Sequence, residues 1–255
     1  MEEKIDHNKP SEKKEAGLFE ELLGDAFNLD RGLPATIYNM FVNPGLVIES
    51  YFTDKGRFVN PIRYTIFILA VTTAITIYLI DYEQFLEQVA NASTQGDFEA
   101  NLEELKEQTG IDWPGYMDTV GEVTILMTTK LNQLLYIVVL APVLAFFSKL
   151  FFKKKKPYFK HHYVMYLYLL ASFAIVSLLL TPLSMLEGGG GIFLFALTFL
   201  MLVYSMFVQS RYLGLKGFDQ HAMSFLSFIF GYIVYSIGSA ILMYGAAAIL
   251  FISRN

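Results

Sequence analysis

Long apolar runs separated by polar connections dominate this chain. Five of these runs are long enough for a helix to cross a bilayer, which takes about 20 mostly apolar residues. The pattern therefore predicts an all-α fold, namely a polytopic membrane protein with five transmembrane helices. The predicted spans cover residues 62–80, 123–148, 164–186, 192–210 and 225–253, and together they make a membrane domain over residues 62–253.

The chain before the first predicted span is polar and then amphipathic. Residues 1–16 are mostly charged or polar and lack the apolar core of a signal peptide, so we expect a disordered cytoplasmic tail. In residues 17–61, apolar positions recur at helical spacing among acidic ones. This pattern predicts an amphipathic helix that lies at the cytoplasmic membrane interface.

Two prolines punctuate the amphipathic segment. The sequence Asn43-Pro44-Gly45 predicts a turn that breaks it into two parts. Asn60-Pro61 predicts the start of the first span, because Asn caps helices well and proline is favourable at the first helical position. The segment therefore has the local signals of a membrane-entry structure.

Lys and Arg are distributed unevenly among the connections. Sixteen lie in residues 1–63, 149–162 and 211–221, which the five spans place on one side of the membrane. The other side has only Lys106 and Arg254. Because cytoplasmic loops carry the excess of basic residues, we expect the N-terminus in the cytoplasm and the C-terminus outside. The outer loop over residues 81–122 carries eleven carboxylates, either as a solvated loop or as a vestibule that attracts cations.

Composition narrows the classes of function. Only 17% of the residues are charged, against about 25% in an ordinary soluble domain. Cysteine is absent, which excludes disulfides, thiolate nucleophiles and zinc ribbons. The predicted spans have no Asp or His in their interiors, and the sequence has no nucleophile-elbow, zinc-protease, P-loop or dinucleotide motif. We therefore expect a protein that is not an enzyme and that needs no cofactor or metal.

Basic residues on the cytoplasmic side are candidates for contact with anionic lipid head groups. They are Arg57, Arg63, Lys153, Lys154, Lys155 and Lys156. A nucleotide or an acidic protein partner is the alternative for the lysine run. Lysine supplies point charge without bidentate recognition, which favours lipid, and no specific nucleic acid is predicted. His161 and His162 follow the run, while Asp219 and His221 lie in the other cytoplasmic loop, so whether these four residues converge is left open.

Polar residues inside two of the spans are candidates for a hydrated path. Lys130 lies about two turns into the second span, where it either snorkels to the interface or faces a cavity. The residues expected to line such a path are Thr72, Thr76, Thr128, Lys130, Asn132 and Gln133. The alternative is that the hydroxyl and amide groups form hydrogen bonds between helices.

The fifth span carries small residues every seven positions: Ser224, Gly231, Gly238 and Gly245. Small residues at this period make a smooth stripe where another helix can approach closely. We expect the stripe to pack either within the protomer or against a second protomer in a homo-oligomer.

Residues 27–70 resemble the hallmark of a family of bacterial membrane proteins, common in Bacteroidetes-type genomes and catalogued as a domain of unknown function. The resemblance lies in Leu29-Asp30-Arg31-Gly32, Thr36, Pro44-Gly45, Ile48, Tyr51, Arg57 and Pro61, followed by a spanning helix. The resemblance implies an integral inner-membrane protein and supplies no activity. Many members begin with a Cys-rich, zinc-ribbon-like stretch, which this chain lacks.

Three classes of function remain. We favour a non-catalytic scaffold or assembly module of a bacterial inner membrane. The second class is a channel or permease with a polar path near Lys130. The third is a membrane effector that is gated when Lys153–Lys156 bind an anionic cytoplasmic ligand.

Overall fold

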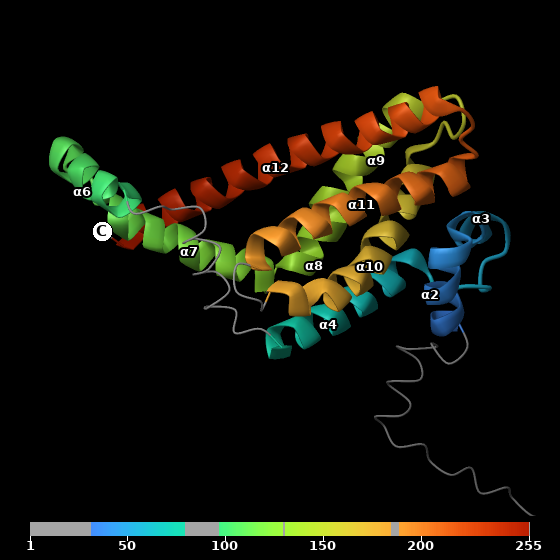
Figure 1. Cartoon of the computed structure of the whole chain (residues 1–255), viewed down its shortest axis with the longest axis horizontal. Coiled ribbons are helices and arrows are strands. Elements are labelled where there is room, and N and C mark those ends of the chain that lie inside the picture. Colours follow the sequence, from blue (N-terminus) through green and yellow to red (C-terminus); the bar gives the residue numbers. More distant parts are fainter. Residues whose placement is uncertain (1–31, 80–96, 130, 185–188, 255) are drawn as a thin grey trace, which may run out of the picture.

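The computed structural model describes residues 32–79, 97–129, 131–184 and 189–254 (Figure 1). The regular structure in these ranges is entirely helical, so the predicted fold class is confirmed as all-α. The predicted tail over residues 1–16 lies outside the described residues, as do the start of the amphipathic segment and part of the outer loop.

The amphipathic segment contributes a helical hairpin in the described part of the chain. Helix α2 (Gly32–Val42) ends just before Asn43, and α3 (Pro44–Thr53) begins at the proline, as the turn signal predicts. Helix α4 (Pro61–Leu79) then starts at the second proline. Asn60 caps it, because its side-chain oxygen accepts a hydrogen bond of 3.0 Å from the Ile62 N–H.

In the described part of the chain, four helices are long and apolar enough to cross a membrane. They are α4, α10 (Phe159–Ser184), α11 (Gly189–Leu213) and α12 (Phe218–Arg254). These helices correspond to the first, third, fourth and fifth predicted spans. Helix α10 is the central one, with 67% of its most apolar window buried, because α4, α9 and α11 pack around it.

The second predicted span needs a correction, because residues 123–148 do not form one regular α-helix. Helix α7 (Trp113–Thr129) ends inside the predicted span, and the chain continues as α8 (Asn132–Leu135), the π-helix η1 (Tyr136–Leu140) and α9 (Ala141–Phe152). Pro142 gives a physical reason for the irregularity, since it has no N–H to donate to the carbonyl four residues earlier. The Ala141 N–H instead bonds to the Tyr136 carbonyl, five residues back.

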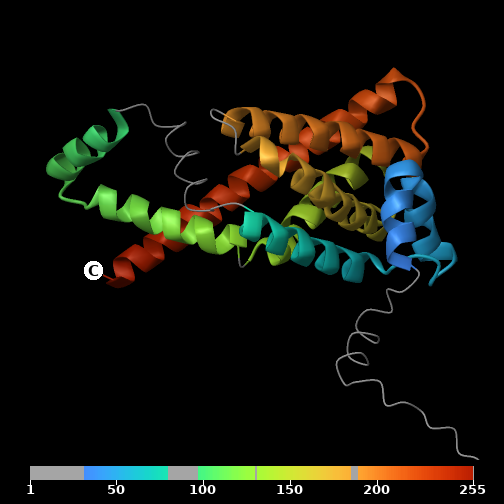
Figure 2. The same ribbon diagram turned by 60° about the horizontal axis from the view of Figure 1, so that its bottom comes forward.

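Helix α7 and the C-terminal half of α12 extend side by side beyond the rest of the bundle (Figures 1 and 2). A small apolar core of Val120, Val123 and Ala247 joins them, and an ion pair of 2.8 Å links Glu122 to Arg254. Beyond this two-helix arm lies α6 (Asp97–Thr109), a short helix in the acidic outer loop. Lys106 of α6 pairs with Asp112 at 2.7 Å, which lowers the pKa of that carboxyl.

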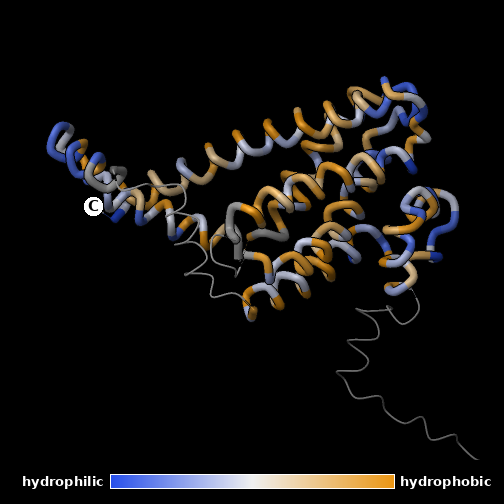
Figure 3. The backbone as a smooth tube through the Cα atoms, viewed as in Figure 1, coloured by the Kyte–Doolittle hydropathy of each residue, from blue (hydrophilic) through white to orange (hydrophobic). Residues whose placement is uncertain are grey.

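The polar surface lies at the two ends of the molecule and the apolar surface lies between them (Figure 3). The α2–α3 hairpin, the α9–α10 loop and the α11–α12 loop share one end, while α6 and the C-terminus lie at the other (Figure 1). The connections that carry the basic residues therefore share one end of the bundle. Lys155 links two of these connections: its Nζ in the α9–α10 loop donates a 2.8 Å hydrogen bond to the Gly214 carbonyl in the α11–α12 loop.

Candidate functional site

A cavity of about 430 Å³ lies between α4, η1, α10, α11 and α12. Its volume falls within the range of about 300–1,000 Å³ that is typical of small-molecule sites. Hydroxyl side chains from all five elements are part of its lining, among apolar groups such as Leu69, Leu140 and Phe173. The hydroxyl residues are Thr72, Thr73, Thr76, Tyr136, Ser177, Thr198, Tyr232 and Tyr235.

The threonine and serine hydroxyls are partly engaged by their own helices. Thr72 donates to the Ile68 carbonyl at 2.8 Å, Ser177 to the Ala174 carbonyl at 2.8 Å, and Thr198 to the Leu194 carbonyl at 2.9 Å. Such bonds use the hydroxyl hydrogen and leave an oxygen lone pair available. At these positions the cavity wall therefore presents mainly acceptors.

The cavity lies deep along the helices and opens on the side of the bundle. Thr72 to Ile77 lie about 17–24 Å from the start of α4, at a rise of 1.5 Å per residue. In a hydrocarbon core about 30 Å thick, residues at this depth lie from the middle of the core into the half that is farther from the start of α4. Ile77, Thr198 and Tyr232 line the cavity and are also exposed on the outer surface of the bundle. The opening therefore faces the apolar belt of the molecule.

The π-helix forms part of the cavity wall. Tyr136 and Leu140, its first and last residues, both line the cavity. The Ile137 carbonyl within it accepts a 3.1 Å hydrogen bond from the Tyr163 hydroxyl of α10. Single π turns inside helices are frequent at functional sites because they re-aim side chains. This wall could not be identified from the apolar pattern of the sequence.

The structure places two of the predicted polar-path residues in this cavity. Thr72 and Thr76 line it, on consecutive turns of α4. Lys130 lies outside the described residues, and the side chains of Thr128, Asn132 and Gln133 are likewise not described. The polar path near Lys130 therefore stays a prediction. Of the residues predicted to line it, Thr72 and Thr76 line the cavity described here.

A second group of buried polar side chains lies closer to the hairpin end. Gln209 of α11 is its centre: Nε2 donates to the Tyr166 hydroxyl at 3.2 Å and to Ser205 Oγ at 3.1 Å, while Oε1 accepts from Ser227 at 3.3 Å. All four side chains have under 2% exposure. This Gln209 cluster joins α10, α11 and α12 through neutral hydrogen bonds, a common way of holding membrane helices together.

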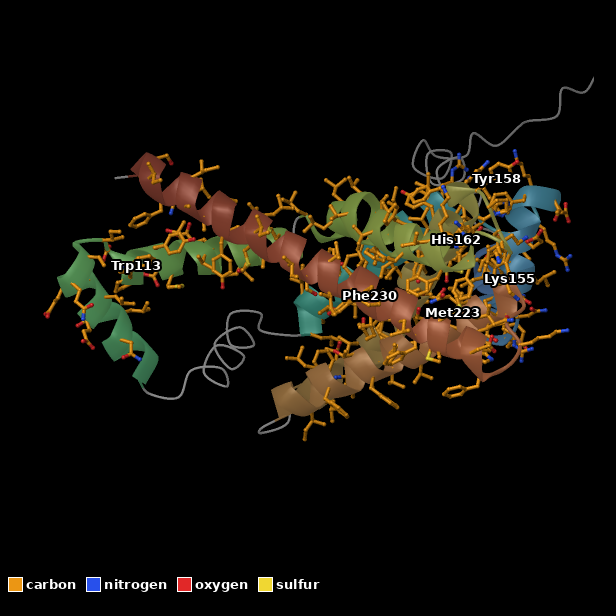
Figure 4. All side chains as sticks on the ribbon, turned by 90° about the horizontal axis from the view of Figure 1, so that it is seen from above. Trp113, Lys155, Tyr158, His162, Met223 and Phe230 are labelled. Atoms are coloured by element: carbon orange, nitrogen blue, oxygen red, sulfur yellow. The ribbon has the colours of Figure 1, made fainter. Side chains whose placement is uncertain are left out.

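The two histidines that follow the lysine run have separate structural partners. Figure 4 shows His162 at the same end of the molecule as Lys155 and Tyr158. His162 is fully buried, with Nε2 at 2.9 Å from the Lys156 carbonyl and Nδ1 at 2.9 Å from Ser148 Oγ. A carbonyl can only accept, so Nε2 carries a proton. His161 Nδ1 lies 2.7 Å from the Tyr212 hydroxyl. No group of three His, Cys, Asp or Glu residues in the described ranges is arranged to hold a metal ion.

The hairpin is held to the bundle by an aromatic and ionic contact. Lys156 pairs with Glu49 of α3 at 2.8 Å and lies over the Tyr212 ring at 5.0 Å. The Phe52 ring of α3 packs on the His161 ring with centroids 4.0 Å apart. Gly45 lets α3 approach α11, because a Cβ there would lie 2.8 Å from the Arg211 carbonyl oxygen.

The predicted lipid-contact residues fall into two groups. Lys155 and Lys156 make bonds within the protein, as described above. Lys153 and Lys154 are exposed, and so are Arg57 and Arg63 near the start of α4. Arg57 lies over the Phe58 ring at 5.5 Å. The side chains that remain available to contact an anionic membrane surface are therefore mainly Arg57, Arg63, Lys153 and Lys154.

We predict that Lys153→Gln with Lys154→Gln reduces the enrichment of anionic lipid around the protein by about thirtyfold, because each of the two lysines near an anionic surface adds about 1 kcal/mol. Lys156→Gln should change the enrichment less, since this lysine already pairs with Glu49. The measurement is the lipid composition retained in mixed nanodiscs at low and high salt. Equal enrichment for wild type and the double variant at low salt would contradict the prediction.

The predicted stripe on α12 divides into two halves. Ser224 and Gly231 are buried, and a Cβ on Gly231 would lie 2.9 Å from Leu144 Cδ2 of α9. At Gly238 and Gly245, no atom of the described residues lies within 4 Å of the position that a Cβ would take. The stripe therefore supports close packing within the protomer in its first half only. Ser224 Oγ is the single buried side-chain oxygen or nitrogen in the described part of the chain that has no hydrogen-bond partner.

Comparison with known proteins gives no match to a family model, to a curated protein or to a solved structure. The resemblance of residues 27–70 to an uncharacterised bacterial membrane family therefore stays a prediction. The described residues form an all-α structure in which four helices are long and apolar enough to cross a membrane.

Proposed function

We propose that this chain is a non-catalytic, multi-pass protein of a bacterial inner membrane that holds a membrane-soluble ligand in the cavity between α4, α10, α11 and α12. The observation that carries the proposal is the cavity itself, which lies at hydrocarbon depth and opens onto the apolar belt. For a scaffold or assembly module, such a cavity has a function if a lipid-like molecule bound in it is one of the components that the protein assembles or senses. The bacterial inner membrane is inferred from the resemblance of residues 27–70.

The proposed topology has five crossings, with the N-terminus in the cytoplasm. It is supported by the irregular run from α7 to α9, which leads from the arm back to the hairpin end (Figures 1 and 2). The apolar part of this run, Tyr136–Phe152, has 17 residues, close to the minimum for a span. With this crossing counted, the basic loops share the cytoplasmic side.

The topology predicts opposite labelling of two exposed positions. The chain has no cysteine, so Gln108→Cys on α6 and Lys55→Cys after α3 each introduce a single thiol. An impermeant thiol reagent should label Gln108→Cys in intact cells and should label Lys55→Cys only after the membrane is permeabilised. The reverse pattern would place the N-terminus outside.

Blocking the cavity tests the proposed function. Ala174 lines it, so Ala174→Phe puts an aromatic ring into the ligand volume. We expect at least one lipid-soluble molecule that co-purifies with the wild type, seen by mass spectrometry, to be lost from this variant. The matched control is Ala74→Phe, which adds the same ring on the exposed face of α4.

The outcomes separate the proposal from its alternatives. If wild type, Ala174→Phe and Ala74→Phe carry the same small molecules, the cavity is not a ligand site and the proposal fails. The channel or permease alternative is supported by Thr72 and Thr76, which line the same cavity. It predicts that Ala174→Phe reduces solute flux in proteoliposomes, with Ala74→Phe again as the control.

A further inference from the structure

The aromatic wall of the cavity carries two phenol groups that have no hydrogen-bond partner in the described part of the chain. Phe228, Tyr232 and Tyr235 follow one face of α12, and the rings of Phe228 and Tyr232 stack at 5.9 Å. The hydroxyls of Tyr232 and Tyr235 make no hydrogen bond to any described residue, unlike that of Tyr166 in the Gln209 cluster. In hydrocarbon, an unpaired O–H group costs free energy, so a partner inside the cavity stabilises it.

The other hydroxyl groups of the cavity are less available as donors. Thr72, Ser177 and Thr198 have already donated their hydrogens to backbone carbonyls. Among the lining side chains that make no hydrogen bond to a described residue, Tyr232 and Tyr235 are therefore the strongest donors. Thr73 and Thr76 on the facing helix α4 add weaker hydroxyl groups with no bond within the described residues.

Charge is absent from the lining. Among the described residues, no Asp, Glu, Lys, Arg or His faces the cavity. A phosphate or carboxylate head group at hydrocarbon depth would lose its hydration without gaining a counter-charge. The ligand that fits the wall is therefore neutral, with acceptor oxygens for the two phenols and an apolar body for the surrounding side chains.

We propose that the cavity selects an uncharged, membrane-soluble molecule that carries carbonyl oxygens, and that Tyr232 and Tyr235 donate the hydrogen bonds that select it. This inference rests on the proposed function and narrows the class of ligand. Carbonyl oxygens on an apolar body occur both in alkylated quinones and in neutral glycerides, and either source supplies the same recognition chemistry.

The test uses the full-length protein in detergent and four probes: a decyl-substituted benzoquinone, dioleoylglycerol, an alkylbenzene of similar size without oxygen, and dioleoylphosphatidylglycerol. The readout is the concentration of probe that raises the unfolding temperature by half of its maximum. We expect the quinone or the glyceride to bind at least tenfold more tightly than the alkylbenzene. Whichever of the two binds more tightly identifies the source of the carbonyl.

Conservative variants connect the binding to the two phenols. Tyr232→Phe with Tyr235→Phe keeps both rings and removes both donors, so the affinity for the carbonyl probe should fall roughly thirtyfold, given about 1 kcal/mol for each of the two hydrogen bonds. Its affinity for the alkylbenzene should stay within about twofold. Tyr244→Phe, on the same helix outside the cavity, is the control.

Several outcomes would overturn the inference while leaving the proposed function intact. One is unchanged affinity in the double variant together with loss of binding in Ala174→Phe. Another is tighter binding of the anionic lipid than of both neutral carbonyl probes, with the same sensitivity to Ala174→Phe. Failure of every probe while a native molecule is still lost from Ala174→Phe would also overturn it. Failure of the proposed function has a different signature, namely no molecule that depends on Ala174.

Discussion

Gly231→Leu should lower the unfolding temperature and the folded yield of the protein sharply, whereas Gly238→Leu should leave both near the wild-type values. At Gly231 even a Cβ atom would lie 2.9 Å from Leu144 Cδ2 and 3.3 Å from Leu144 Cα. A leucine there must push α12 away from α9, and overpacking of a tight contact costs about 1–3 kcal/mol or more. The two glycines are two turns apart on the same helix, so they form a matched pair.

Both variants can be measured by thermal unfolding and size-exclusion chromatography in the same detergent. A normal unfolding temperature for Gly231→Leu would mean that α12 does not meet α9 as described. No atom of the described residues lies within 4 Å of the position that a Cβ on Gly238 would take. A smaller oligomer for Gly238→Leu, with normal stability, would therefore assign the second half of the stripe to a protomer–protomer contact. An unchanged size would leave that half facing lipid.

Gln209→Leu should destabilise the bundle by about 2 kcal/mol. The substitution leaves Tyr166, Ser205 and Ser227 without the amide that bonds to them. A buried group that loses its partner costs about 1–3 kcal/mol in soluble proteins, and hydrogen bonds between membrane helices average nearer 0.6 kcal/mol. Three lost bonds at the membrane value give the expected total.

A double-mutant cycle distinguishes lost hydrogen bonds from poor packing. Tyr166→Phe removes the hydroxyl that Gln209 bonds to, so the double variant should cost less than the sum of the two single variants. Gln108→Leu, on the exposed face of α6, is the control and should have little effect. Strict additivity in the cycle would show that the Gln209–Tyr166 bond does not contribute to stability.

The apolar pattern predicted the long helices well because each crosses the bundle without interruption. Pro61 and Asn60 fixed the start of α4, and the hairpin turn at Pro44 is where the proline signal places it. The structure of residues 123–148 was harder to predict. Hydropathy measures how apolar a segment is and does not show whether the segment forms one regular α-helix. Only Pro142 marked the irregular turn, and proline is tolerated in membrane helices without one.

The candidate site was predictable only in part. Thr72 and Thr76 were identified because hydroxyls stand out in an apolar helix, and they do line the cavity. Tyr232 and Tyr235 were not identified, since a tyrosine in a chain with 16 tyrosines reads as interfacial or lipid-facing surface. Gln209 was overlooked because it lies at the end of an apolar run, where an amide is expected to meet water. These residues are distinguished by the side chains that surround them on other helices. A single sequence does not show which residues are neighbours in the fold.

The π-helix at Tyr136–Leu140 has a consequence for how this chain can change over time. A π turn accommodates one more residue than an α turn, and each residue rotates an α-helix by about 100°. Deleting one residue between Tyr136 and Leu140 would restore the α-helical phase of this run and turn α8 relative to α9 by about that angle. A single-codon deletion is therefore expected to change the direction in which the chain before the π turn presents its side chains to the bundle.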